Sequence, residues 1–344
     1  MFNHMRRGLI AFALSTMSSA LWGQDAPSES DEENVEKPFS GVNMRTPTLG
    51  GTQFWGDELV LREWRIQRHA FTGHFRLLDE RNNRRAWGSW EACQAKLEQI
   101  QRDEGIEPIK GKVVVLLHGL ARSRAFMRHF ARHLHDEGGY EIVNVEYPST
   151  RADLSSHAQS LARVISHVEG AEEINFVAHS LGNLVVRHYL YNEAAAAKTA
   201  GRPLDPRIKR FVMLGPPNHG AAMARLFESA PLYDVVLRGV GKELAGFDEL
   251  DAKLGTPPCE FAILAGGKGD DSGWNPLVAG DDDLLVKVEE ARLAGARDFR
   301  LLKVWHARLG SDPQALALSL KFLQQGCFTT DAERQPIEAE AATP

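Results

Sequence analysis

The stretch INFVAHSLGNLVV, residues 174–186, decides the fold class of this chain. Its first residues are apolar or β-branched and predict a strand that ends at Ala178, and the apolar spacing from Leu181 onward predicts a helix. A serine in so short a turn is forced into a strained conformation that lifts its hydroxyl clear of the sheet. Small residues, Ala178 and Gly182, are expected on either side because they face each other across the bend. The pattern predicts a nucleophile elbow with Ser180 as the nucleophile; the alternative is a serine that only caps the helix.

Strands and helical stretches alternate along the chain around this elbow. Apolar runs predict strands over residues 113–117, 141–147, 174–178, 208–214, 261–265 and 299–305. Ser311-Asp312-Pro313 is typical of a final helix start, and Gly326 suits its stop. Strands separated by helices indicate an α/β fold with an open, mostly parallel central sheet flanked by helices.

Residues 55–104 have a mixed pattern ahead of this alternation. Two short strands, Trp64–His69 and His74–Leu78, are predicted around a turn at Thr72-Gly73, and residues 89–103 are predicted to be helical. We expect this region to add antiparallel strands and a helix to the edge of the main sheet. Its residues show no pattern that points to chemistry.

Two backbone amides are expected to bind a developing oxyanion. The N–H of Leu181 lies at a helix amino terminus, where negative charge is stabilised. The second donor is expected from the loop after the strand at 113–117, where Leu120 follows Gly119, a residue that lets the backbone approach closely. His118 precedes the serine in the chain, and we expect it to structure this loop rather than to act as the base.

A serine hydroxyl needs a base that takes its proton and an acid that orients the base. Behind an elbow of this kind, the acid and then the histidine follow in the chain. His306 comes after the last predicted strand, where its loop can fold back over the serine, so it is the predicted base. His219, in GPPNHG at 215–220, is the alternative; otherwise it anchors its loop or lines the pocket.

The acid is expected between the strand at 261–265 and the histidine at 306. The candidates are Asp270, Asp271, Asp281, Asp282, Asp283 and Asp298. Asp283 is the predicted acid and Asp282 is the next choice. At least two of the three adjacent carboxylates at 281–283 are expected to lie in a solvated loop. Asp298 begins a strand, far from the site, and is expected to be structural.

From about Gly111 to Phe328 the chain resembles the bacterial lipase and esterase branch of the α/β-hydrolase superfamily. The stretches that carry the resemblance are VVLLHGLARS (114–123), FVAHSLGNLVVRHYL (176–190), MLGPPNHG (213–220) and the run 275–306. In relatives the acid commonly lies in Asn-Asp-Gly-x-Val, followed by an acidic residue and Arg-Leu. Residues 282–293 are similar and put the acid on Asp283, although Leu284 replaces the glycine and Ala178 replaces the first glycine of the elbow.

The resemblance implies an α/β-hydrolase fold with a lid or cap. The segment 219–257 carries many apolar residues at the position where lipase-like enzymes have a lid, so it is predicted to cover an acyl pocket; the alternative is an ordinary helix packed on the sheet. An apolar cap favours acyl esters or lipids as substrates and is compatible with contact at a lipid interface.

The amino terminus is predicted to be an export signal. Arg6 and Arg7 precede the short apolar stretch 9–14, and small residues at 18–20 suit cleavage. We therefore expect residues 1–23 to be a signal peptide of a periplasmic or extracellular protein. Residues 24–51 are predicted to be an acidic disordered linker, 52–328 the hydrolase domain and 329–344 a flexible tail.

The composition limits which partners, disulfides and metal sites can be expected. A net charge of −6 argues against a broad basic surface for nucleic acid, and no apolar run is long enough to span a membrane. Among three cysteines, Cys259 and Cys327 are a candidate disulfide, with separate thiols as the alternative. His129 and His133 lie one helical turn apart, but no third ligand is evident, so neither a metal nor a cofactor is predicted.

The residues together predict a serine hydrolase of carboxylic esters, a lipase or esterase that works through an acyl-enzyme. An acyltransferase or a thioesterase would use the same residues. A binding protein on the same fold is the third alternative, and it would usually lack one member of the triad.

Overall fold

The structure is a computed structural model of the chain and describes residues 46–47, 53–220, 254–276 and 279–338. A six-stranded parallel sheet has the order β11-β10-β9-β8-β6-β7. Its strands are β6 (Gly111–Leu117), β7 (Glu141–Val145), β8 (Ala171–His179), β9 (Ile208–Leu214), β10 (Glu260–Gly266) and β11 (Asp298–Leu302). Each of the six predicted strands is confirmed, but β7 and β11 end earlier than expected.

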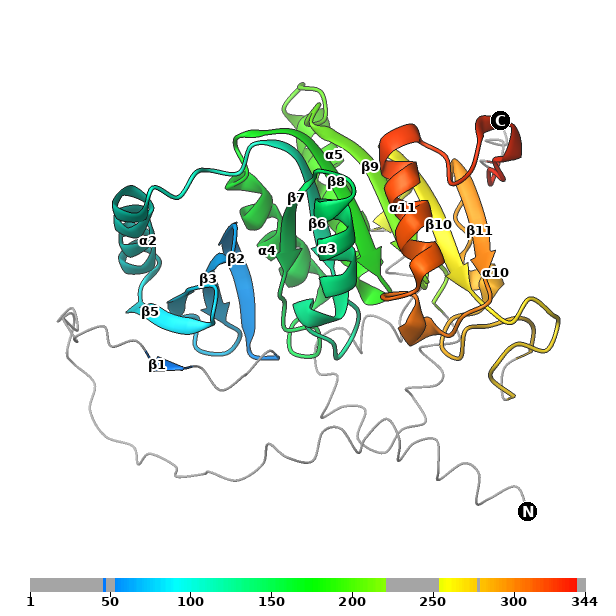
Figure 1. Cartoon of the computed structure of the whole chain (residues 1–344), viewed down its shortest axis with the longest axis horizontal. Coiled ribbons are helices and arrows are strands. Elements are labelled where there is room, and N and C mark those ends of the chain that lie inside the picture. Colours follow the sequence, from blue (N-terminus) through cyan, green and yellow to red (C-terminus); the bar gives the residue numbers. More distant parts are fainter. Residues whose placement is uncertain (1–45, 48–52, 221–253, 277–278, 339–344) are drawn as a thin grey trace, which may run out of the picture. The chain divides into compact units, whose positions relative to one another are not determined.

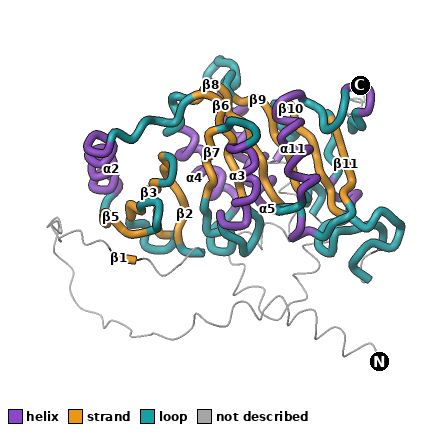
Figure 2. Tube along the Cα trace, in the orientation of Figure 1, coloured by secondary structure: helices purple, strands orange, loops and turns teal. Residues whose placement is uncertain are grey.

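Helices cover both faces of this sheet (Figure 1, Figure 2). They are α3 (Arg128–Asp136), α4 (Leu154–Ser166), α5 (Leu181–Thr199) and α11 (Pro313–Gln325), and a 3-10 turn, η1 (Arg124–Met127), precedes α3. Side chains of α4 and α5 belong to one buried cluster, and side chains of α3 and α11 belong to a second cluster. The parallel strands are therefore buried on both sides, which explains their continuous apolar runs.

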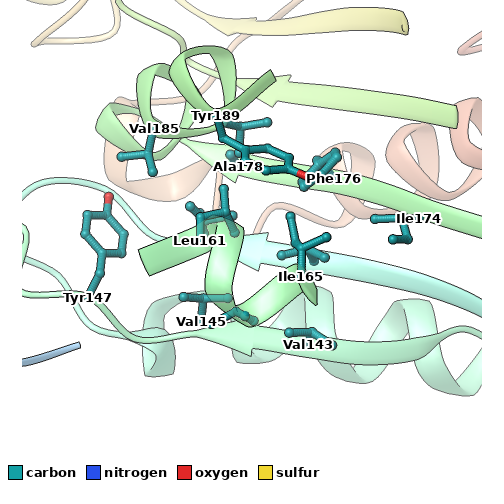
Figure 3. Packing of buried hydrophobic residues seen from close by; sticks show 14 of the residues in the cluster. Val143, Val145, Tyr147, Leu161, Ile165, Ile174, Phe176, Ala178, Val185 and Tyr189 are labelled. Atoms are coloured by element: carbon teal, nitrogen blue, oxygen red, sulfur yellow. The ribbon is translucent and has the colours of Figure 1, made fainter. Parts of the chain in front are cut away.

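The larger cluster packs β7 and β8 against α4 and α5 (Figure 3). Val143 and Phe176 have no exposed surface, and Leu161 and Val185 are each 1% exposed. Truncating such a side chain to alanine costs about 2–5 kcal/mol, because the neighbours collapse only partly into the space. This packing fixes the strand and the helix that meet at residue 180.

Helix α11 begins and ends where its sequence predicts. Asp312 is the N-cap and accepts hydrogen bonds from the backbone of Gln314 and Ala315, and Pro313 occupies the first turn, where its missing N–H has no cost. Gly326 ends the helix with a left-handed φ of 75°, a conformation that glycine adopts without strain.

A second sheet of five antiparallel strands precedes the main one, in the order β1-β5-β4-β3-β2. Its elements are β1 (Thr46–Pro47), β2 (Trp55–Leu61), β3 (Trp64–His69), β4 (Phe75–Leu78), β5 (Asn83–Gly88) and the helix α2 (Trp90–Glu104). The predicted strands and helix are confirmed, but the prediction that they extend the main sheet is wrong. The five strands form a sheet of their own. Asp57 of β2 is hydrogen-bonded to Glu146, just past the end of β7: its N–H donates to Glu146 O at 2.8 Å and its Oδ2 accepts from Glu146 N at 2.7 Å.

The carboxyl-terminal segment packs against the domain. Asp298 is fully buried and accepts hydrogen bonds from the N–H groups of Phe328 at 2.9 Å and Gln335 at 3.0 Å. Ile337 packs on the larger cluster and exchanges backbone hydrogen bonds with Gly295 and Ala296. The structural role predicted for Asp298 is confirmed, and the prediction of a flexible tail is wrong for residues 329–338.

All three cysteines are free thiols. Cys259 packs against the cluster of α4 and α5, whereas Cys327 follows α11, whose side chains belong to the other cluster. The candidate Cys259–Cys327 disulfide is therefore wrong, because both residues are free thiols.

Several predicted segments lie outside the described residues: the signal peptide, nearly all of the acidic linker, and most of the predicted lid, at 221–253. No helix in the described part of the chain is long and apolar enough to cross a membrane.

Candidate active site

Ser180 lies at the turn between β8 and α5 and has φ 53° and ψ −123°. Such a conformation costs a non-glycine residue about 1–3 kcal/mol and persists only where neighbours hold it. The Ser180 N–H donates to Leu214 O at 2.9 Å, and the Ser180 carbonyl accepts from the backbone and side chain of Asn183 at 3.0 and 2.9 Å. Asn183 is a site residue that the sequence reasoning missed; its signal is an amide on a fully buried stretch of helix.

Two glycines let the end of β6 approach the elbow. A Cβ atom on Gly182 would lie 2.7 Å from His118 O and 3.0 Å from Leu117 Cβ. The neighbouring strand thus requires a small residue at Gly182. A Cβ atom on Gly119 would lie 2.9 Å from Ser180 Cβ and 2.9 Å from His179 Nδ1, so this loop lies directly against the serine.

The two candidate oxyanion donors are placed by these contacts. Leu181 is the first residue of α5, and the first N–H groups of a helix have no acceptor within it. Leu120 follows Gly119, whose backbone packs on Ser180. Both amides therefore belong to segments that meet at the serine.

His306 and Asp283 form a buried pair. His306 begins the short turn η2 (His306–Arg308) after β11, and its Nδ1 lies 2.7 Å from Asp283 Oδ2. The His306 N–H also donates to the Asp283 carbonyl at 2.8 Å. Asp283 Oδ1 accepts from the N–H groups of Leu285 at 3.1 Å and Val286 at 2.8 Å. Because a carboxylate only accepts, Nδ1 carries the ring proton and Nε2 is left as an acceptor.

Nε2 of His306 is buried and has no hydrogen-bond partner among the residues that the structure describes. The ring lies beside the elbow, since a Cβ atom on Gly215 would be 3.1 Å from His306 Nδ1. Gly215 directly follows Leu214, whose carbonyl binds Ser180 N. The structure thus pairs the predicted histidine, after β11, with the predicted aspartate, after β10, and places Gly215 between the His306 ring and the backbone that binds Ser180 N, after β8.

His179 is a second residue that the sequence reasoning left without a role. Its ring centroid is 4.6 Å from that of His306, and its Nε2 lies 2.9 Å from His306 O. Burial, and to a smaller extent the charge of His306, holds the pKa of His179 well below its usual range. His179 is therefore neutral, and its Nε2–H donates to the His306 carbonyl. This bond holds the backbone from which the His306 side chain extends.

The other adjacent aspartates shape the loop. Asp282 is 1% exposed and accepts from the N–H groups of Asn275 at 3.0 Å and Leu284 at 2.7 Å. Burial raises the pKa of Asp282. Asp281 accepts from the N–H groups at 268 and 269. The prediction that at least two of the three carboxylates are solvated is wrong, because Asp282 and Asp283 are both buried.

Leu284 occupies the place where the resembling proteins have glycine, and its φ is +89°. The backbone therefore keeps a conformation that suits glycine, although the side chain makes it costly. The Leu284 N–H binds Asp282, and its carbonyl accepts from Asn275 Nδ2 at 3.1 Å. These bonds hold the loop that carries the acid.

The rival histidines lie elsewhere. His118 is buried, with Nδ1 2.8 Å from Gly119 O and Nε2 3.3 Å from Glu146 Oε1, so it structures its own loop as expected. His219 is exposed, and its N–H donates to Glu290 O at 3.1 Å. Within the described ranges, no three His, Cys, Asp or Glu side chains form a group that could hold a metal ion.

Comparison with known proteins adds four findings. A family model described as "Domain of unknown function (DUF7379)" matches residues 81–246. No curated protein matches the chain. A gene product of Listeria innocua is 16% identical, with a TM-score of 0.44 over 67% of this chain and 99% of its own. An esterase of Pyrococcus furiosus is 15% identical, with a TM-score of 0.43 over 84% of this chain and 99% of its own.

Identities and TM-scores as low as these say nothing about activity. The fold is instead evident from the arrangement of this chain's own strands and helices. Its parallel sheet has helices on both faces, a serine elbow joins β8 to α5, and an acid and a histidine follow β10 and β11. This chain has the α/β-hydrolase fold.

Proposed function

We propose that the chain is a serine hydrolase of carboxylic esters, with Ser180 as nucleophile, His306 as base and Asp283 as the acid that orients it. The observation that carries the proposal is the state of His306. Its Nδ1 is bound to a buried carboxylate at 2.7 Å, and its Nε2 has no partner in the described part of the chain. An imidazole whose Nδ1 is held by a carboxylate and whose Nε2 is unpaired has a nitrogen with which to accept a proton from a serine hydroxyl.

The first half of the reaction forms an acyl-enzyme. The Ser180 oxygen attacks the ester carbonyl carbon while its proton moves to His306 Nε2. The carbonyl oxygen becomes an oxyanion against the N–H groups of Leu120 and Leu181. The bond to the alcohol oxygen then breaks, and the alcohol leaves with the proton from Nε2.

The second half repeats these steps with water. His306 takes a proton from water as the hydroxyl oxygen attacks the acyl carbon. The bond from that carbon to the Ser180 oxygen breaks, the serine regains its proton, and the carboxylic acid leaves. Throughout, Asp283 holds the ring in place and stabilises the imidazolium, and its own Oδ1 and Oδ2 are fixed by three hydrogen bonds.

Hydrolysis of a short-chain p-nitrophenyl ester by Ser180→Ala tests the proposal. We expect turnover to fall to background with an unchanged circular dichroism spectrum, and Ser166→Ala, an exposed serine on α4, to keep wild-type turnover. Activity retained by Ser180→Ala would reject the assignment. Adding an alcohol or thiol acceptor separates hydrolysis from acyl transfer, because a transferase forms a new ester or thioester rather than free acid.

A further inference from the structure

We infer that Gln53, in the turn that leads into β2 of the amino-terminal sheet, is a positioning residue for the oxyanion loop. The inference rests on the proposed function and deepens it. The amino-terminal sheet carries none of the proposed catalytic side chains, and under this inference the turn leading into it helps to position the oxyanion loop.

Gln53 joins two loops that the main sheet presents side by side. Its Nε2 donates to Arg122 O at 2.7 Å, in the loop after β6. Its Oε1 accepts from Thr150 N at 3.2 Å, from Thr150 Oγ1 at 3.0 Å and from Ser149 Oγ at 3.3 Å, in the loop after β7. Ser149 and Thr150 are buried, so the loop after β7 fixes the side-chain amide of Gln53. The fixed amide in turn holds the Arg122 carbonyl.

The loop that Gln53 holds is a tight turn around Leu120. The Arg122 N–H donates to Gly119 O at 3.3 Å, which closes a four-residue turn. Ala121, the third residue of this turn, has a φ of +54°, a conformation that costs a residue with a Cβ atom about 1–2 kcal/mol. A turn of this shape with alanine in place of glycine needs bonds from outside to persist.

Those outside bonds come through Gln53 and its neighbour. The Ala121 N–H donates to Ser149 Oγ at 3.0 Å, and the Ser149 hydroxyl in turn donates to Gln53 Oε1. The turn is therefore held at its third residue by Ser149 and at its fourth by Gln53. Because Leu120 lies between Gly119, which is packed on Ser180, and Ala121, these bonds set the direction of the Leu120 N–H.

Gln53→Glu tests this with a nearly isosteric change. The carboxylate keeps acceptors for Ser149 and Thr150, but it puts an oxygen against Arg122 O where an N–H now donates. We expect kcat per active site, counted by fluorophosphonate titration, to fall about 10- to 100-fold, with KM within about twofold, since one oxyanion donor is misaligned rather than removed. Inhibition by an alkyl boronic acid, which forms a tetrahedral adduct with the serine, is expected to weaken by the same factor as kcat.

Ser149→Ala removes the hydroxyl that accepts from the Ala121 N–H. We expect it to lower kcat and to weaken boronic acid inhibition by the same factor. Gln99→Glu, the same change on the exposed face of α2, is the control and is expected to leave both values unchanged. Wild-type kcat per titrated site in Gln53→Glu would overturn the inference, as would a loss that only follows the number of folded sites. Failure of the proposed function itself shows differently, as turnover that survives in Ser180→Ala.

Discussion

Replacing Asp283 with asparagine tests how the acid controls the histidine. In the native site Oδ2 accepts from His306 Nδ1 at 2.7 Å, while Oδ1 accepts from two backbone N–H groups, of Leu285 at 3.1 Å and Val286 at 2.8 Å. An asparagine has one acceptor and one donor end. The two N–H groups fix its oxygen at the position of Oδ1, and its NH₂ group must then face His306.

The expected loss of kcat follows from the two arrangements open to the asparagine amide and His306. Turning the amide around would leave two buried N–H groups without acceptors, at about 1–3 kcal/mol each. It is cheaper for His306 to move its proton to Nε2 and accept at Nδ1. In that tautomer Nε2 cannot take the serine proton, and we expect kcat to fall about 10⁴-fold, equivalent to about 5 kcal/mol in the barrier.

The assay is steady-state hydrolysis of a p-nitrophenyl ester by Asp283→Asn and, in parallel, by Asp282→Asn. Asp282 accepts from the backbone at Asn275 and Leu284, and an amide oxygen can keep the shorter of these bonds. We therefore expect Asp282→Asn to lose less than about tenfold. The reasoning is refuted if Asp283→Asn stays within tenfold of wild type, or if Asp282→Asn shows the larger loss.

Three further outcomes follow from the same geometry. Gly119→Ala puts a Cβ atom 2.9 Å from Ser180 Cβ, and kcat is expected to fall about 100-fold; full activity would show that the loop can shift freely. Leu284→Gly relieves a φ of +89° and is expected to raise the free energy of unfolding in urea by up to about 1 kcal/mol, whereas a loss would show that its packing matters more. Burial lowers the pKa of His157 to about 3, below its value of 6.5 when unfolded, so its contribution to stability is complete above pH 6.5 and is lost as pH falls toward 3. His157→Phe is expected to flatten this decline in urea titrations and His167→Phe, at an exposed site, is not; equal slopes in both variants would contradict the assignment.

Parts of the structure that are formed by residues adjacent in the chain could be predicted from local sequence patterns. The elbow is one example, because the strand, the turn and the helix around Ser180 are contiguous in the chain. The limits of α11 are another, since Asp312, Pro313 and Gly326 act on the helix that they flank. The chain order that a serine elbow imposes indicated His306 as the base and a segment with six candidate acids, and the family resemblance put the acid on Asp283.

Contacts between distant segments could not be predicted in the same way. The amino-terminal strands pair among themselves in a sheet of their own, and β2 is tied to the segment after β7 by Asp57 and Glu146, two polar residues that show no periodic pattern. The burial of Asp282 depends on Asn275 folding back over it. Gln53 and Ser149 are 96 residues apart, and nothing near either residue indicates the other.

Mapping the residue that a fluorophosphonate modifies tests the central claim most directly, because this reagent reacts with a serine only when a base activates it. Mass spectrometry of the digested wild-type protein is expected to find the label on Ser180 alone, to find none in Ser180→Ala, and to find labelling slowed at least about 10³-fold in His306→Ala. An unlabelled Ser180 in the folded protein, or a rate unaffected by loss of His306, would contradict the account.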